Sequence, residues 1–258
     1  KIDFITYVSA TDRDAAFLSG KLDGMLTDYP GATLLQAKGS RLRLVMETDG
    51  SLSLIASKKS NVRNPDDLKG KNISVSGNTF VEYATDEVMK RACLHPGEVN
   101  KPEINNIPLR LMMLEDGQIS ASFLPGPATA IALNNGHTAL LNTRQMGLRC
   151  TGIVFSEKAI TEKDEEIRRF ITGYNLGVKY LQTRPQNEWT EILVKEFGLQ
   201  EKAAMQIDLP DYRPATRPSY HDIEKIIAWL KSKGAIPDYY PGENLVDTTF
   251  IPGTLKPQ

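Results

Sequence analysis

The alternation of short apolar runs with helix-length runs constrains the fold of this chain more than any other feature. The runs expected to form strands are residues 2–8, 22–27, 42–48, 51–57, 71–75 and 119–124. The runs expected to form helices between and after them are residues 11–18, 30–37, 80–92, 109–116 and 126–134. Strands and helices that alternate at these lengths predict α/β units with a mostly parallel sheet flanked by helices.

The second half of the chain is expected to be mostly helical. Residues 164–183 place their large apolar side chains on one face at helical spacing, and residues 188–197 and 220–233 predict two further helices. The segment from Pro237 onward is rich in Pro, Gly and Tyr, so it is expected to wrap the surface. The segment 51–57 has two interpretations after the Asp49-Gly50 turn: the second strand of a hairpin, or a strand crossing into a second lobe.

Size and charge limit the classes of protein to which the chain can belong. Its 258 residues lie at the upper end of what one hydrophobic core serves, so two lobes are expected. The net charge is −1 without a long run of one sign, which disfavours a nucleic-acid partner. No apolar run approaches the length of a membrane span. Cys93 and Cys150 are expected to be free and largely buried thiols, with a disulfide as the alternative.

The usual catalytic and cofactor motifs are missing from the sequence. The three histidines form no paired metal-ligand motif, and there is no G-x-S-x-G elbow, no Walker A loop and no G-x-G-x-x-G. We therefore expect no catalytic residues, no metal and no cofactor.

Polar loops follow several predicted strands and lead into helices, which is where open α/β sheets bind ligands. The strongest candidate is Ser76-Gly77-Asn78-Thr79-Phe80, because a glycine permits close approach and the helix start offers free N–H groups. Thr79 with Glu82 also fits a capping box, so its hydroxyl has a purely structural alternative.

Three weaker candidates occupy similar positions at strand ends. They are Ser9 with Thr11, Asp28 with Tyr29, and Pro125 with Gly126. Each has a structural alternative: Thr11 as a helix cap in a box with Asp14, Asp28 as a cap, and the prolines as a rigid corner. Together with the missing catalytic motifs they favour a polar binding cleft.

Several segments together resemble a known family. Residues 9–16 and the "G-x-h-D-G" element at residues 20–24, followed by a strand and Asp28, resemble the first lobe of periplasmic-type (type 2) solute-binding proteins. They are similar to the nitrate/sulfonate/taurine and thiamine-pyrimidine-binding group of ABC importers. Residues 67–75 resemble the opening of the second lobe, residues 76–80 its ligand loop, and residues 115–121 a second copy of the first element.

The resemblance implies a two-lobed fold joined by two hinge strands, expected at residues 51–57 and 149–155. It divides the chain into lobe I (residues 1–50 and 152–258) and lobe II (residues 51–151). Asp49 and Thr151, near the crossings, complete the expected set of ligand-binding residues. The family begins with an earlier strand and helix, and Lys1 aligns with its second strand, so that unit is expected to be missing from this sequence.

The resemblance also implies a function. It predicts a monomer that captures a small polar or anionic solute, closes on it, and delivers it to an ABC transporter permease. The expected location is the periplasm or, through a lipid anchor, the outer face of the cytoplasmic membrane. One alternative is an enzyme on the same fold, as in pyrimidine synthesis or the menaquinone pathway, with Cys150 as its only candidate nucleophile. A receptor-like sensor is another.

Overall fold

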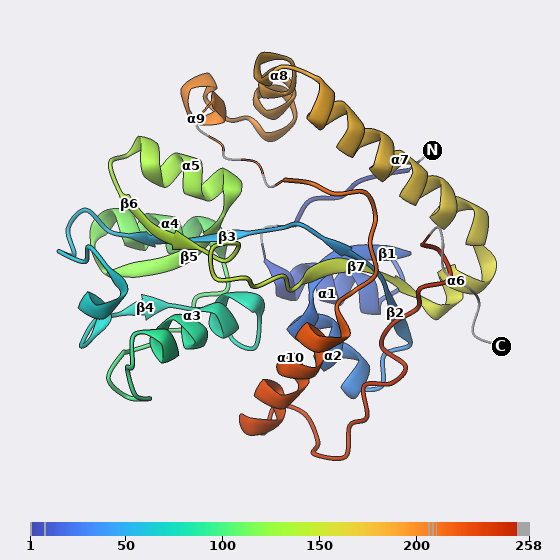
Figure 1. The fold of residues 1–258 in the computed structure, drawn as a ribbon, viewed down its shortest axis with the longest axis horizontal. Coiled ribbons are helices and arrows are strands. Elements are labelled where there is room, and N and C mark those ends of the chain that lie inside the picture. Colours follow the sequence, from blue (N-terminus) through green and yellow to red (C-terminus); the bar gives the residue numbers. More distant parts are fainter. Residues whose placement is uncertain (1, 8, 206, 208, 210, 252–258) are drawn as a thin grey trace.

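The computed structural model describes residues 2–7, 9–205, 207, 209 and 211–251, and it contains two sheets with helices packed on each (Figure 1). We call the three-stranded sheet and its helices lobe I, and the four-stranded sheet and its helices lobe II. The lobe I sheet has the order β1 (Gly24–Asp28), β7 (Thr151–Ser156), β2 (Leu42–Thr48). The lobe II sheet has the order β4 (Ile73–Ser74), β5 (Ala121–Pro125), β3 (Leu52–Ala56), β6 (Thr138–Asn142).

Each helix from α1 to α7 belongs to one of the two lobes, whereas the helices that follow α7 lie against both lobes. Lobe I carries α1 (Ala10–Leu18), α2 (Tyr29–Ala37), α6 (Glu157–Glu162) and α7 (Asp164–Thr183). Lobe II carries the short η1 (Pro65–Leu68) and the helices α3 (Phe80–Arg91), α4 (Ile107–Asp116) and α5 (Gly126–Asn134). The later helices α8 (Gln186–Phe197), α9 (Glu201–Met205) and α10 (Tyr220–Ser232) reach both lobes, because α9 packs on α5 and α10 packs on α2.

Strand direction differs from the expectation of mostly parallel sheets. In lobe I the returning strand β7 lies between β1 and β2 and runs antiparallel to both. In lobe II β3 runs antiparallel to β5 and β6, and only β4 and β5 pair in parallel. The reason is the crossing of the chain: β3 and β7 each enter their sheet from the other lobe, and each runs opposite in direction to the strands with which it pairs.

Two segments, residues 49–51 and 143–150, connect the sheets. β2 pairs with β7 and β3 pairs with β5 and β6, so the crossing interpretation of residues 51–57 is confirmed and the hairpin is wrong. The two segments contact each other where they leave lobe I: the Thr48 hydroxyl lies 2.9 Å from the Thr151 hydroxyl. At the lobe II end the backbone of Leu52 bonds the hydroxyl and the amide of Thr143, at 3.0 and 2.9 Å.

The N-terminal expectations are wrong in two respects. Residues 2–7 form no strand, and Phe4 is 82% exposed, because no neighbouring strand pairs with this segment; Lys1 and Val8 lie outside the described residues. The cap of α1 is Ser9 rather than Thr11, because the Ser9 hydroxyl accepts the amide hydrogen of Asp12. Cys93 and Cys150 are both free; Cys150 is buried as expected, but Cys93 is exposed.

Most other elements match their predicted ranges within a few residues, and α5 and α7 match at both ends. The short elements β6, α6 and α9 were not predicted. The C-terminal segment does more than cover the surface: Leu245 is fully buried, and its carbonyl accepts the amide hydrogen of Leu44 in β2. None of the described helices is long and apolar enough to span a bilayer.

Two glycines test the packing of the central lobe I strand. A Cβ at Gly152 in β7 would lie 2.6 Å from a Leu44 methyl and from the Met46 carbonyl, so Gly152→Ala should overpack the sheet and destabilise the protein by about 1–3 kcal/mol. The matched control is Gly173→Ala on the exposed side of α7, where nothing lies within 4 Å, and it should stabilise by about 0.5–1 kcal/mol. Urea unfolding measures both; equal effects would contradict the packing described.

Candidate functional site

Lobe I and lobe II contact each other at the edges where their strands end. Asp28 ends β1 in lobe I, and the loop 76–80 follows β4 in lobe II. The backbone amide of Phe80 donates a hydrogen bond to the Asp28 carboxylate at 3.0 Å. Beside this contact, Ser9 of lobe I and Asn106 of lobe II form an antiparallel bridge. We take this edge, marked by the two contacts, as the candidate site.

Asp28 joins the N-termini of two helices. Its Oδ1 accepts the Gly31 amide of α2 at 2.7 Å, and its Oδ2 accepts the Phe80 amide of α3. Burial raises the pKa of Asp28, while the two amide hydrogen bonds and the charge of Arg13 oppose the rise. The carboxylate is thus both the cap of its own helix, as one interpretation of the sequence proposed, and a link between the lobes.

The loop 76–80 has few free donors in this arrangement. The amide of Asn78 bonds the Glu82 carboxylate at 2.7 Å, and that of Thr79 bonds the Ser76 carbonyl at 3.3 Å. The Phe80 amide bonds Asp28, and the next amide in α3 bonds the Thr79 hydroxyl at 3.2 Å. Thr79 caps α3 through its hydroxyl, but Glu82 bonds the amide of Asn78 rather than that of Thr79, so the predicted capping box does not form.

Three carboxylates surround this loop, so the start of α3 is an acidic environment. Glu103 lies against Gly77, where an added Cβ would be 2.7 Å from its Oε1. Farther along the loop, Glu82 accepts the amide hydrogen of Asn78 and Asp28 accepts that of Phe80. An incoming anion at the helix N-terminus would meet these charges, whereas a ligand N–H group would find acceptors.

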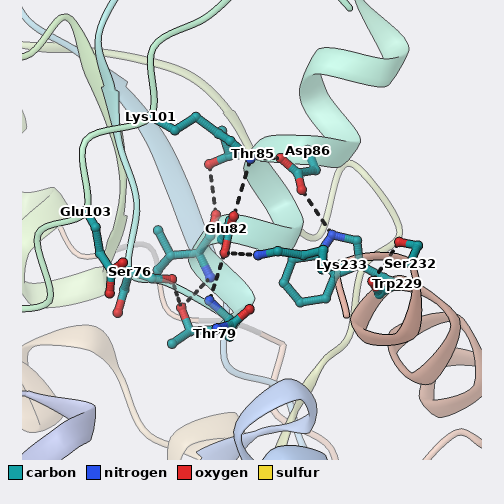
Figure 2. A network of polar contacts seen from close by, with 12 residues as sticks. Ser76, Thr79, Glu82, Thr85, Asp86, Lys101, Glu103, Trp229, Ser232 and Lys233 are labelled. Atoms are coloured by element: carbon teal, nitrogen blue, oxygen red, sulfur yellow. Dashed lines mark hydrogen bonds and ion pairs between the residues drawn. The ribbon is translucent and has the colours of Figure 1, made fainter. Parts of the chain in front are cut away.

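An ion-pair network fixes Glu82 and ties α3 to the segment around α10 (Figure 2). Glu82 pairs with Lys233 and with Lys101, and Lys101 also bonds Asp86 at 2.7 Å. The Trp229 indole N–H donates to Asp86 at 3.0 Å. Burial alone would raise the pKa of Glu82, but the bond from Lys233, the amide bond and the charge of Lys101 lower it overall. Glu82 is therefore an ionised structural group rather than a titrating one.

Asp49 lies at the crossing rather than at the edge of the lobes. It is 8% exposed and bonds Arg149 at 2.8 Å, and it also accepts the backbone and side-chain N–H groups of Arg213, each at 2.8 Å. Arg213 also bonds Glu47, which accepts the Tyr29 hydroxyl hydrogen at 3.0 Å. Both oxygens of Asp49 are therefore engaged within the protein.

The other predicted site residues are distributed between the core and the surface. Tyr29 is fully buried, so it has no exposed ring on which a ligand could stack, and Thr151 belongs to the crossing contact. Thr11 is exposed on α1. Pro125 and Gly126 are partly exposed at the start of α5, with nothing within 4 Å of the position that a Gly126 Cβ would take.

Several residues at this edge were not predicted. Asn105 accepts the Ser76 hydroxyl hydrogen at 2.8 Å, Asn106 caps α4, and Arg110 lies buried one turn into that helix. The sequence carries a signal for them that was not used: consecutive asparagines precede a proline, and one arginine interrupts the apolar run 107–114.

Cys150 does not have the environment of a nucleophile. It is 1% exposed, and burial raises the pKa of its thiol well above the usual value, with the nearby charges of Asp222, Asp28 and Glu47 adding to the rise. Among the described residues, no group of three or more His, Cys, Asp or Glu side chains is placed to hold a metal ion.

The link between the lobes can be tested at one amide. Asp28→Asn keeps an oxygen for Gly31 but turns an NH2 group toward Phe80, so the Phe80 amide loses its acceptor. Hydrogen bonds to charged groups contribute about 1.5–3 kcal/mol, so hydrogen exchange at Phe80 should become at least about tenfold faster. Asp23→Asn, which removes an exposed carboxylate of the same lobe, is the control. Unchanged protection of Phe80 in Asp28→Asn would contradict the contact.

Comparisons with solved structures agree with the overall fold. The ligand-binding component of an ABC-type import system from Staphylococcus aureus, solved with zinc bound, superposes with a TM-score of 0.79 at 15% identity, over 97% of this chain and 87% of that one. The periplasmic aliphatic sulphonate binding protein SsuA from Escherichia coli gives 0.76 at 15% identity, over 100% and 86%. The desulfurization enzyme DSZB gives 0.63 at 12% identity, over 88% and 83%.

These likenesses show a periplasmic-binding-protein-like α/β fold that binding proteins and at least one enzyme share. No curated protein matches the chain at the level of sequence. The family model described as NMT1/THI5 like matches residues 1–188, well over half of the chain. The chain therefore belongs to the NMT1/THI5-like family.

Proposed function

We propose that this protein is the solute-binding component of an ABC importer, which captures a small polar organic solute between its two lobes and closes on it. The observation that carries the proposal is the meeting of polar strand ends from both sheets at Asp28–Phe80 and Ser9–Asn106. Hinge closure of two lobes around a ligand is a common motion for such an architecture. The fold shared with two binding proteins of importers supports it.

The contacts between the lobes define how the protein would work. Asp28–Phe80 and Ser9–Asn106 close the site in the described arrangement, so a solute enters only when these contacts open. Opening frees the Phe80 amide and one Asp28 oxygen, and the solute shifts the equilibrium back to the closed state if it binds that state more tightly. The ligand-binding residues are then Ser9, Asp28 and the loop 76–80, with Pro125 and Gly126 at the lobe II edge.

The proposal also includes the boundaries of the lobes, the partner protein and the cellular location. Lobe I consists of residues 1–50 and 152–258 and lobe II of residues 51–151, although α9 packs against α5 of lobe II. The partner is a membrane permease, and the working location is outside the cytoplasmic membrane. Enzymatic activity is the second candidate because DSZB has this fold, but the buried, protonated Cys150 does not favour it.

A reversible lock across the lobes tests the proposal. Antiparallel bridge partners have Cα atoms about 4.5–5.5 Å apart, within the range of a disulfide. Ser9→Cys with Asn106→Cys, in a Cys93→Ser background, should therefore form a bond that holds the lobes closed. The solute is first identified by native mass spectrometry of the purified wild-type protein. The oxidised, solute-free variant should bind it at least about a hundredfold more slowly, and a reducing agent should restore the rate.

The single variant Ser9→Cys in the same background is the matched control, because it cannot form the bond. Unaltered binding kinetics in the oxidised double variant would place the solute elsewhere and contradict the proposal. Chemical turnover of the retained molecule would favour the enzyme instead.

A further inference from the structure

A hollow of about 260 Å³ lies in lobe II beside the last turn of α3, at the opposite end of that helix from the Phe80 contact. Its walls come from η1, the last turn of α3, the end of β6 and the crossing segment 143–150. Sites for drug-sized ligands enclose about 300–1,000 Å³, so this hollow suits a smaller molecule.

The floor of the hollow is apolar and firmly anchored. Val88 of α3 and Met146 of the crossing segment line it, are 2% and 6% exposed, and belong to one hydrophobic core cluster. Leu141 of β6 also lines the hollow and packs against the same cluster. Side chains held in a close-packed core keep the hollow in shape before a ligand arrives, and they favour a ligand with an aliphatic body.

Arg91 holds a guanidinium group at the rim of the hollow. Its Nη2 donates to the carbonyl oxygen of Met146 at 2.6 Å, the one hydrogen bond that this side chain forms with the part of the chain that the structure describes. The bond fixes the planar group, while its other N–H donors remain available. Arg91 therefore offers a positioned partner for a carboxylate.

Asp66 places a carboxylate on the same rim. The neighbouring Asp67 accepts the amide hydrogens of Arg63 and Asn64, so its carboxylate is used within the turn. Asp66 is exposed, and among the described residues its carboxylate has no hydrogen-bond or ion-pair partner, Arg91 included. Two opposite charges therefore stand apart from each other on the rim of one apolar hollow.

These charges restrict the ligands that suit the apolar floor. An aliphatic carboxylate would pair with Arg91 but bring a like charge to Asp66, and an aliphatic amine would do the reverse. A hydrocarbon would cover both charged groups without bonding either of them. A molecule that carries an ammonium and a carboxylate group on an aliphatic body can pair with both.

We infer that this hollow binds a small aliphatic amino acid as its zwitterion. Arg91 binds the carboxylate and Asp66 binds the ammonium group. The aliphatic side chain packs on Val88, Leu141 and Met146.

Methyl resonances of the full-length wild-type protein locate the ligand. L-leucine should shift the methyl resonances of Val88 and Met146, whereas those of Val81, in the first turn of the same helix and close to the lobe contact, should stay in place.

Three analogues each lack one of the groups that the hollow would recognise. 4-Methylpentanoate has no ammonium group, leucinamide has no carboxylate, and glycine has no side chain. Each should bind at least about threefold more weakly than leucine, because it loses one partly exposed ion pair or the aliphatic contact.

Two variants test the charges through ligand preference, which is measured within each variant and so does not depend on its stability. Arg91→Gln should abolish the preference for leucine over leucinamide. Asp66→Asn should abolish the preference for leucine over 4-methylpentanoate. The matched controls Arg63→Gln and Asp116→Asn, at exposed positions of the same lobe, should keep both preferences.

Leucine that shifts Val81 instead of Val88 would lie in the cleft between the lobes and overturn the inference. Methyl resonances that leucine does not move, analogues that bind as tightly as leucine, or preferences unchanged in the two variants would overturn it as well. The proposed function does not depend on this outcome, because the lock between Ser9 and Asn106 tests a different site.

Discussion

The two-lobed arrangement depends on the carboxylate of Asp49, which holds together three segments of the chain at the crossing between the lobes. It follows β2 as the chain leaves lobe I, bonds Arg149 as the chain returns, and bonds Arg213 of the C-terminal segment. Burial lowers the pKa of Arg213, but its bonds to Asp49 and Glu47 raise it overall, so the charges stay in place. Asp49 is buried while the Arg213 and Arg149 side chains are 40% and 47% exposed, so these bonds fix the geometry of the crossing at the surface of the protein.

The candidate site follows from that fixed crossing. The chain crosses between the sheets at residues 49–51 and 143–150, and the two lobes also meet at Asp28 and Phe80. The edge is chemically divided: carboxylates occupy the start of α3, whereas α4 carries the buried Arg110.

Periodicity and capping signals predicted the local structure well, because they depend on neighbouring residues. The helices α5 and α7 and the cap at Thr79 are examples. Strand direction was wrong, because the pairing of β7 between β1 and β2 is set by contacts more than 100 residues apart. For the same reason, the partners of Asp28 and Asp49 could not be read from the chain: Phe80 and Arg213 reach them only after folding. Arg110 could have been singled out from the sequence, because it is the one charged residue in the otherwise apolar run 107–114.

Small-angle X-ray scattering of the purified protein, with and without the solute found by native mass spectrometry, tests the central claim most directly. The account predicts an open population without solute, whose radius of gyration falls as the solute saturates the protein. A saturating solute that leaves the radius of gyration and the scattering profile unchanged would contradict closure of the lobes around it.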